Sequence, residues 1–179
     1  MKLFFAVVIS IFILIIIFSF YITRDGQIIT PVGEGTITLD TGVYENFPLP
    51  DYAAKMITEN YKSYFIEVEP GLKVHILEVG EGFPVFLMHG NPTSGFLYRK
   101  IADKLPQDKV RVIMPTSIGL GFSSKIPASQ HTLSNHIRWI NKVLNELQLN
   151  EVIYSGQDWG GPIGMGLSLI HISEPTRLR

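Results

Sequence analysis

Ser155-Gly156-Gln157-Asp158-Trp159-Gly160-Gly161 is the stretch that decides the fold of this 179-residue chain. It follows a β-branched and aromatic run at residues 151–154, which favours a strand, and it leads into further glycine. The pattern G-x-D-x-G predicts a sharp turn between a strand and a helix, because side chains two positions before and after Asp158 would collide with neighbouring backbone. We therefore expect the aspartate at the carboxyl end of a sheet, where open α/β folds bind ligands.

A carboxylate at such a turn indicates one kind of chemistry. Aspartate has a reference pKa of about 3.9, so it is ionised at neutral pH and needs no base to act as a nucleophile. Its target would be a saturated carbon with a leaving group, as in an alkyl halide or an epoxide, and the product would be an alkyl ester on the protein. Hydrolysis of that ester requires an oxyanion hole. The backbone N–H groups of Trp159 and of the residue after an earlier strand are expected to supply it.

The sequence before this turn alternates between strand and helix patterns. Residues 63–69 and 72–79, which Pro70 and Gly71 separate, predict an antiparallel hairpin. Three apolar runs predict strands buried on both faces: residues 83–89, 110–115 and 151–155. Helical patterns lie between them at residues 95–105 and 133–147. This order predicts an α/β fold with a mostly parallel sheet and flanking helices.

Other aromatic and histidine residues are predicted to be structural. Trp139 lies in the amphipathic helix and is expected to pack in the core. His89 directly follows a strand and is expected to brace the next loop. His75, His131 and His136 lie on a strand or near a helix start, where we expect surface or core roles rather than catalysis.

Two motifs in register resemble a known family. The strand at residues 83–89 ends in His89-Gly90-Asn91-Pro92-Thr93, and Asp158-Trp159-Gly160-Gly161 follows later. Together they resemble the α/β-hydrolase superfamily and, within it, the haloalkane dehalogenases, over roughly residues 64–165. The resemblance implies that Asp158 is the nucleophile and that the side-chain N–H groups of Asn91 and Trp159 hold the departing halide. It also implies that the backbone N–H groups of Asn91 and Trp159 form the oxyanion hole.

The sequence departs from the family pattern in two places, and it leaves rival functions open. Thr116 stands where the family tends to have aspartate, and Gln157 stands where histidine often precedes the nucleophile. An epoxide hydrolase shares the Asp-Trp-Gly turn, but it has an aromatic residue at the position of Asn91 and requires tyrosines from a cap. A non-catalytic hydrolase-like module on a membrane is a further alternative. A serine esterase is disfavoured, because no serine occupies the centre of the turn.

Composition narrows the choice of partners. The formal net charge is −1 and no basic block occurs, which argues against nucleic-acid binding. The chain has no cysteine, which excludes disulfides, thiolate metal sites and a cysteine nucleophile. We expect a small-molecule haloalkane or epoxide substrate, with no cofactor and no metal.

The N-terminus predicts a membrane anchor. Residues 3–22 carry no charge and would rise about 30 Å as a helix, which matches the thickness of the bilayer hydrocarbon. The bulky residues that end this run, Phe20, Tyr21 and Ile22, favour an uncleaved anchor at residues 1–24 over a cleaved signal peptide. Lys2 precedes the span, so we expect the domain on the non-cytoplasmic side. Residues 25–62 are expected to form a tether and lead-in to a partial hydrolase core at residues 63–166.

The C-terminal residues predict a non-native tail. Residues 167–177 resemble the translation of a sequencing adapter, so residues 167–179 are expected to be foreign to the protein. The chain would then hold the N-terminal half of an α/β-hydrolase fold. The catalytic histidine and its acid would lie further downstream in the parent protein, and His171 would not be that base. We therefore expect no turnover from residues 1–179.

Overall fold

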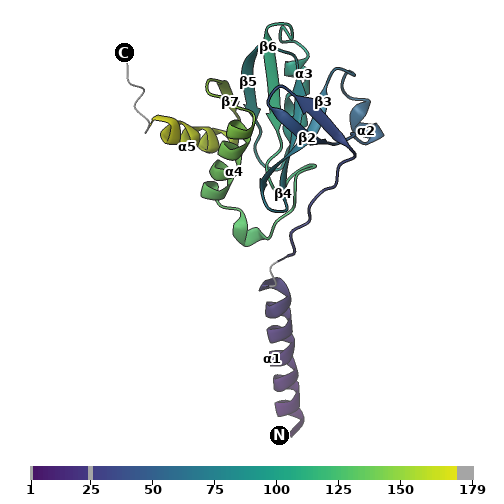
Figure 1. The fold of residues 1–179 in the computed structure, drawn as a ribbon. Coiled ribbons are helices and arrows are strands. Elements are labelled where there is room, and N and C mark those ends of the chain that lie inside the picture. Colours follow the sequence, from purple (N-terminus) through teal and green to yellow (C-terminus); the bar gives the residue numbers. More distant parts are fainter. Residues whose placement is uncertain (1, 24–25, 173–179) are drawn as a thin grey trace.

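The computed structural model describes the backbone of residues 2–23 and 26–172, and the side chains of residues 9–19 and 26–169. Over the described residues, a seven-stranded sheet has the order β1-β2-β3-β4-β6-β5-β7 (Figure 1). The strands are β1 (Thr36–Leu39), β2 (Gly42–Asn46), β3 (Lys62–Glu69), β4 (Leu72–Val79), β5 (Phe83–Met88), β6 (Val110–Pro115) and β7 (Ile153–Gly156). The helices are α1 (Lys2–Thr23), α2 (Asp51–Ala54), α3 (Arg99–Ala102), α4 (Leu133–Glu146) and α5 (Gly160–Ile172), with 3-10 turns η1 (Gly95–Tyr98) and η2 (Ala128–Gln130).

The sheet is mixed, which corrects the prediction of a mostly parallel one. The strands from β1 to β4 pair antiparallel with their neighbours, and β4 also pairs antiparallel with β6. Only β6, β5 and β7 run parallel. The predicted hairpin of β3 and β4 is confirmed, with Phe65 opposite His75. The difference arises because the lead-in at residues 25–62 contributes β1 and β2, a second hairpin that extends the sheet beside β3.

Both faces of the sheet are covered, because side chains alternate along each strand. On one face, Ile76 of β4 and Phe86 of β5 pack against the helices α4 and α5, which lie together on that side (Figure 1). On the other face, Leu77 and Leu87 from the same strands pack near η1 and α3. Strands β4 and β5 thus lie between two apolar layers.

Helix α4 confirms the predicted amphipathic segment and fixes one wall of the site. Thr132 caps its first turn, since the Thr132 hydroxyl oxygen accepts a hydrogen bond from the Asn135 backbone N–H. Trp139 is 2% exposed, which confirms its predicted packing role, and its indole N–H donates to Glu69 at 2.9 Å. Leu133, the first residue of this helix, is 39% exposed and lies outside the core. His136 lies on the buried face instead.

Strand β7 is less buried than its sequence predicts. It pairs only with β5 within the described chain and forms the edge of the sheet, and Ile153 is 56% exposed. The prediction that residues 151–155 are buried on both faces is therefore wrong. Apolar composition marks a strand that could be buried, but burial itself depends on a neighbouring strand. After β7, helix α5 continues through residues 167–172 of the predicted tail, and Leu167 packs into the core.

The predicted membrane anchor is not supported. Over the residues that the structure describes, no helix is both long enough and apolar enough to cross a membrane. The expected single span at residues 1–24, the membrane as a partner and the non-cytoplasmic location are corrected accordingly. Lys2 and Arg24, on which the orientation was argued, lie outside the described side chains.

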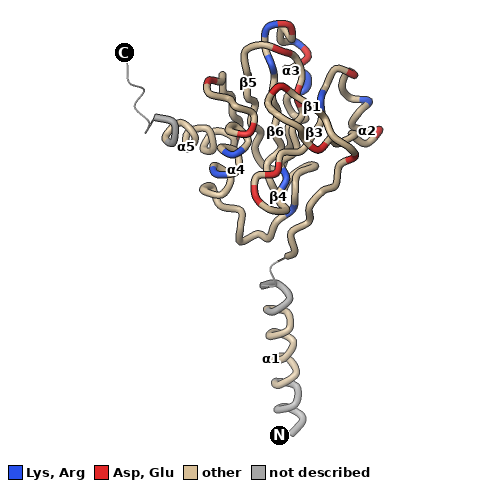
Figure 2. Tube along the Cα trace, in the orientation of Figure 1, with Lys and Arg blue, Asp and Glu red and all other residues tan. Residues whose placement is uncertain are grey.

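Charged residues are distributed over the whole domain. Figure 2 shows Lys and Arg intermixed with Asp and Glu on the loops and strands around the sheet. The described residues of α5, directly after Asp158, include none of these charged types. The surroundings of the predicted turn are therefore apolar on the helix side.

Candidate active site

The topology brings three loops together at one end of the sheet. Strand β5 lies between β6 and β7, and all three are parallel, so their carboxyl ends point the same way. The loops that follow them hold residues 89–93, 116–124 and 157–159. Each predicted site residue lies in one of these loops: Asn91 follows β5, and Asp158 and Trp159 follow β7. Residues more than sixty positions apart in sequence are thereby brought into contact.

The turn at Asp158 has the geometry that the glycine pattern predicts. Asp158 has a φ of 53°, a left-handed conformation that is uncommon outside glycine. A Cβ at Gly156 would lie 2.5 Å from the carbonyl carbon of Gly160, and a Cβ at Gly160 would collide with the Met88 carbonyl oxygen. The turn is tied to β5, since the Gln157 backbone N–H donates to that same Met88 oxygen at 3.1 Å. Both glycines are therefore required by close backbone approach.

The Asp158 carboxylate is exposed and held by backbone donors. The Asn91 backbone N–H donates to Asp158 Oδ1 at 2.9 Å. The backbone N–H groups of Asn91 and Trp159 lower the pKa of Asp158 from its ordinary value, because they stabilise the ionised form. Among the described residues, Asp158 forms no salt bridge. Its charge is consequently oriented but not neutralised by a cation.

His89 braces two of the three loops. The Ser117 backbone N–H donates to His89 Nε2 at 2.9 Å, so this nitrogen carries no proton and Nδ1 carries it. Nδ1 lies 2.7 Å from the Gly90 carbonyl oxygen, to which it donates. Burial lowers the pKa of His89, which keeps the ring neutral at physiological pH. This geometry agrees with the structural role that its position in the sequence indicates.

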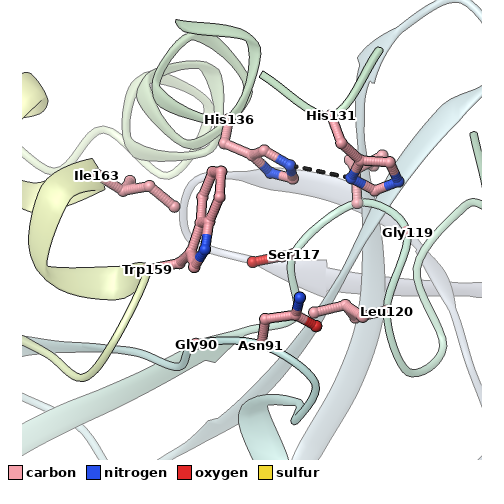
Figure 3. Close-up of a pocket in the computed structure, with 10 residues that line it drawn as sticks. Gly90, Asn91, Ser117, Gly119, Leu120, His131, His136, Trp159 and Ile163 are labelled. Carbon is pink, nitrogen blue, oxygen red and sulfur yellow. Dashed lines mark hydrogen bonds between the residues drawn. The ribbon is translucent and has the colours of Figure 1, made fainter. Parts of the chain in front are cut away.

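A pocket of about 260 Å³ opens beside the turn (Figure 3). Its lining residues come from all three loops and from both helices that cover this face: Gly90, Asn91, Ser117, Ile118, Gly119, Leu120, His131, His136, Trp159 and Ile163. Asp158 does not line it, but borders an adjoining apolar hollow of about 350 Å³ together with Leu133, Trp159 and Pro162. Trp159, which is 41% exposed, separates the two spaces. The structure thus brings Asn91 and Trp159 into one pocket, with Asp158 at its border.

Two histidines in this pocket were not predicted to belong to the site. His131 Nδ1 lies 3.3 Å from His136 Nε2, and the His136 ring makes an edge contact with the Trp159 indole, with the ring centroids 5.9 Å apart. Burial, followed by the influence of His131 and His89, lowers the pKa of His136 to about 4. The sequence did contain a signal for His136, because it lies four residues before the buried Ile140 on the same helix.

Only the structure shows what Thr116 and Ser117 contact. Thr116 is fully buried, and its hydroxyl oxygen accepts a hydrogen bond from the Gly95 backbone N–H at 3.1 Å. At the position where the family pattern has aspartate, this chain thus has a hydroxyl that contacts the backbone. Ser117, one residue further, lines the pocket. Among the described residues, no group of three or more His, Asp or Glu side chains is arranged to hold a metal ion.

Comparison with known proteins defines the family. A model of the alpha/beta hydrolase fold matches residues 84–179, more than half of the chain. The chain belongs to this family. The matched region begins within β5 and includes all three loops of the pocket.

Within the alpha/beta hydrolases, the chain is haloalkane dehalogenase-like over part of its length. It is 39% identical over 127 residues to a haloalkane dehalogenase of Psychrobacter cryohalolentis, which covers 66% of this chain and 39% of that protein. It is 38% identical over 121 residues to a cis-3-alkyl-4-alkyloxetan-2-one decarboxylase of Shewanella oneidensis, which covers 66% of this chain and 37% of that protein. The alpha/beta hydrolase chain therefore spans about four tenths of the length of these curated relatives.

A solved epoxide hydrolase has the same arrangement of elements. The epoxide hydrolase VrEH1 from Vigna radiata superposes with a TM-score of 0.59 at 27% sequence identity, covering 65% of this chain and 36% of that one. The names of these relatives therefore indicate different reactions, although all three are similar to this chain. The choice between them for this alpha/beta hydrolase rests on its own pocket residues.

Proposed function

We propose that this pocket belongs to a hydrolase that cleaves carbon–halogen bonds of haloalkanes through an alkyl ester on Asp158. The observation that carries the proposal is the pairing of Asn91 with the turn: its backbone N–H holds Asp158 Oδ1 at 2.9 Å, while its side chain lines the pocket beside Trp159. An ionised nucleophile therefore lies next to a pocket that two neutral N–H donors line, and Trp159 borders both the pocket and the hollow beside Asp158.

In the first step, a carboxylate oxygen of Asp158 forms a bond to the carbon that carries the halogen. The carbon–halogen bond breaks, and the halogen leaves with the electron pair as a halide ion. The Asn91 side-chain amide and the Trp159 indole N–H would donate hydrogen bonds to that ion. Because both donors are neutral, they do not form an ion pair with Asp158 before the reaction.

In the second step, water attacks the carbonyl carbon of the ester, and the carbonyl oxygen becomes an oxyanion. Asp158 Oδ1 already accepts a hydrogen bond from the Asn91 backbone N–H, so the ester oxygen at this position would start the step in contact with a donor. Collapse of the intermediate would release the alcohol and restore the carboxylate. The base that takes the proton from water has no assigned residue.

Epoxide hydrolysis is the second candidate, favoured by the structural likeness to VrEH1. Its first step also needs a carboxylate nucleophile, but the leaving group is an alkoxide that stays on the substrate and must be protonated. The pocket offers Asn91 where the sequence pattern of epoxide hydrolases has an aromatic residue. This neutral amide favours a departing halide, so haloalkanes are the first choice.

The test is to incubate the chain with 1-bromobutane and, separately, with 1,2-epoxybutane. We expect release of bromide and a butyl adduct on the peptide that contains Asp158, both detected in the same sample by ion chromatography and mass spectrometry. Asp158→Asn should abolish both signals, and Asp108→Asn, a change at an exposed aspartate, should leave them intact. An adduct only from the epoxide would favour the second candidate. No adduct from either would support a non-catalytic module and contradict the proposal.

A further inference from the structure

The loop after β6 contains four hydroxyl side chains, and one of them differs from the rest. Thr116, Ser123 and Ser124 each make hydrogen bonds to main-chain atoms, at 2.6–3.1 Å. Three of these bonds, from the backbone N–H groups of Gly95, His75 and Lys73, hold the loop against β4 and η1, and the fourth lies within the loop. The hydroxyl of Ser117 makes no hydrogen bond to any residue that the structure describes. The loop therefore uses three hydroxyls for its own folding and leaves one free.

Ser117 is nevertheless fixed in place. Its backbone N–H donates to His89 Nε2 at 2.9 Å, and its carbonyl oxygen accepts from the Leu120 backbone N–H at 3.0 Å. The residue is only 6% exposed. The Ser117 hydroxyl is not among the buried polar atoms without a partner, since it faces the pocket, where it can donate to a ligand. The backbone thus holds a free donor in a defined position.

The direction of this hydroxyl identifies the kind of ligand. Figure 3 shows the Ser117 oxygen pointing into the pocket, on the side where the Trp159 indole nitrogen and the Asn91 amide also point. His131 and His136 lie further along the wall, and the lowered pKa of His136, about 4, leaves that ring uncharged at neutral pH. A hydroxyl and two N–H groups, with no nearby cation among the lining residues, are suited to a small anion.

We propose that Ser117 is a third donor to the departing halide and a determinant of halide preference. This inference rests on the proposed function, because it assigns Ser117 to the same halide site as Asn91 and Trp159. As the carbon–halogen bond breaks, the Ser117 O–H would rotate towards the halide and share the charge that develops on it. Hydrogen bonds to an ion are stronger when its charge is more concentrated, so this donor favours chloride over bromide and bromide over iodide.

The experiment measures halide binding by the fluorescence of one tryptophan. The chain has two tryptophans, Trp139 and Trp159, so Trp139→Phe leaves Trp159 as the reporter. In this background, chloride, bromide and iodide are titrated with and without Ser117→Ala. Ser117→Thr, which keeps a hydroxyl, is the rescue variant. Ser124→Ala is the matched control, since its hydroxyl bonds to the backbone of Lys73 instead. Circular dichroism checks that each variant is folded.

We expect Ser117→Ala to weaken chloride binding by at least about tenfold, since a hydrogen bond to a charged group contributes about 1.5–3 kcal/mol. Iodide binding should weaken less, and Ser117→Thr should restore the order of the halides. Equal losses for all three halides in Ser117→Ala, or no loss at all, would overturn the inference.

A variant of Asn91 separates this result from failure of the proposed function. If Asn91→Ala weakens bromide binding while Ser117→Ala does not, the halide site stands and only the role of Ser117 is wrong. If neither the starting protein nor any variant binds bromide, the proposed function and the role of Ser117 are both contradicted. Should Trp139→Phe prevent folding, isothermal titration calorimetry with both tryptophans present gives the same comparison.

Discussion

Asp158 and Glu78 are carboxylates of the same sheet, and their surroundings differ in nearly every respect. Asp158 follows β7, is exposed, and is held by backbone N–H groups alone. Glu78 lies within β4 and is 1% exposed. Arg111 on β6 donates to both of its oxygens, at 2.9 and 2.8 Å, and the Tyr64 hydroxyl donates to Oε2 at 2.6 Å. One negative charge is oriented and available, and the other is fully neutralised.

The comparison shows what makes a carboxylate reactive in this fold. A nucleophile must keep its lone pairs and its charge, so its supports have to be neutral donors that leave one side open. In a structural carboxylate, hydrogen bonds occupy the lone pairs and a cation balances the charge, because a buried charge is tolerated only when it is paired and hydrogen-bonded. Burial alone would therefore select Glu78 as the unusual group. Geometry at the carboxyl end of the parallel strands selects Asp158.

The largest expected effect is on reactivity. Asp158→Asn should lower the rate of alkylation by 1-bromobutane by at least about a thousandfold, since the amide is not a nucleophile. The free energy of unfolding should be nearly unchanged, because asparagine also tolerates the left-handed conformation at this exposed position. Adduct formation and urea denaturation measure the two quantities. A large loss of stability would show that Asp158, like Glu78, has a structural role.

The second effect is on stability, at the other carboxylate. Arg111→Met should destabilise the fold by about 3–5 kcal/mol, because among the described cations it leaves the buried Glu78 only Lys62, at 3.8 Å. Adding Glu78→Gln to this variant should recover part of the loss. The matched control is Arg138→Met, which removes an exposed ion pair with Glu69 and should cost less than about 1 kcal/mol. If urea denaturation gave equal losses of stability for the two arginine variants, the contrast between the buried and the exposed ion pair would be contradicted.

A third, smaller effect is the dependence of stability on pH, which arises from the buried histidines His136 and His75. Burial lowers the pKa of His136 from 6.5 to about 4 and that of His75 from 6.5 to about 3, so the unfolded state binds protons more readily than the folded state below pH 6.5. Stability should therefore fall as the pH decreases from about 6.5 towards 4, by at most about 1.4 kcal/mol per histidine and pH unit. His136→Gln should flatten this profile in urea denaturation at pH 7, 6 and 5. A profile unchanged by the substitution would show that His136 is not the group responsible.

The smallest expected effect is no change at all. The pKa of Asp158 is lowered from 3.8, so the carboxylate is ionised across the neutral range. The single-turnover rate of alkylation by 1-bromobutane should then be constant between about pH 5 and pH 8. This is measured by quenching the reaction and counting adducts. A rate that rises with a midpoint near pH 6 to 7 would indicate a histidine that activates the nucleophile, and would weaken the view that Asp158 acts unaided.

Much of the fold could be predicted because local pattern and tertiary structure agree there. The hairpin of β3 and β4, the strands β5 and β6, and the helix α4 follow from alternation, apolar runs and helical period in their own residues. The strands β1 and β2 were not predicted, because Thr36–Leu39 alternates over only four residues and the order of this hairpin depends on the pairing of β2 with β3. The exposure of β7 also had no local signal, since it depends on which strands lie beside it.

The candidate site divides in the same way. Gly156, Asp158 and Gly160 identify the turn from sequence because steric exclusion acts between residues a few positions apart. The residues that lie near this turn only in three dimensions carry no comparable sequence signal. Ser117 and His131 line the pocket because β6 lies next to β5 in the sheet, a fact of strand order that no short window contains.

The amino-acid sequence by itself determined the sharp turn, its ionised side chain and the succession of strands and helices, because these depend on sterics and periodicity over a few residues. Only the tertiary structure decided which side chains share a pocket with that turn, that the sheet is mixed and that Asp158 stays unpaired while Glu78 is neutralised. These properties depend on the pairing of distant strands, since only the order of strands in the sheet places their loops and charges side by side.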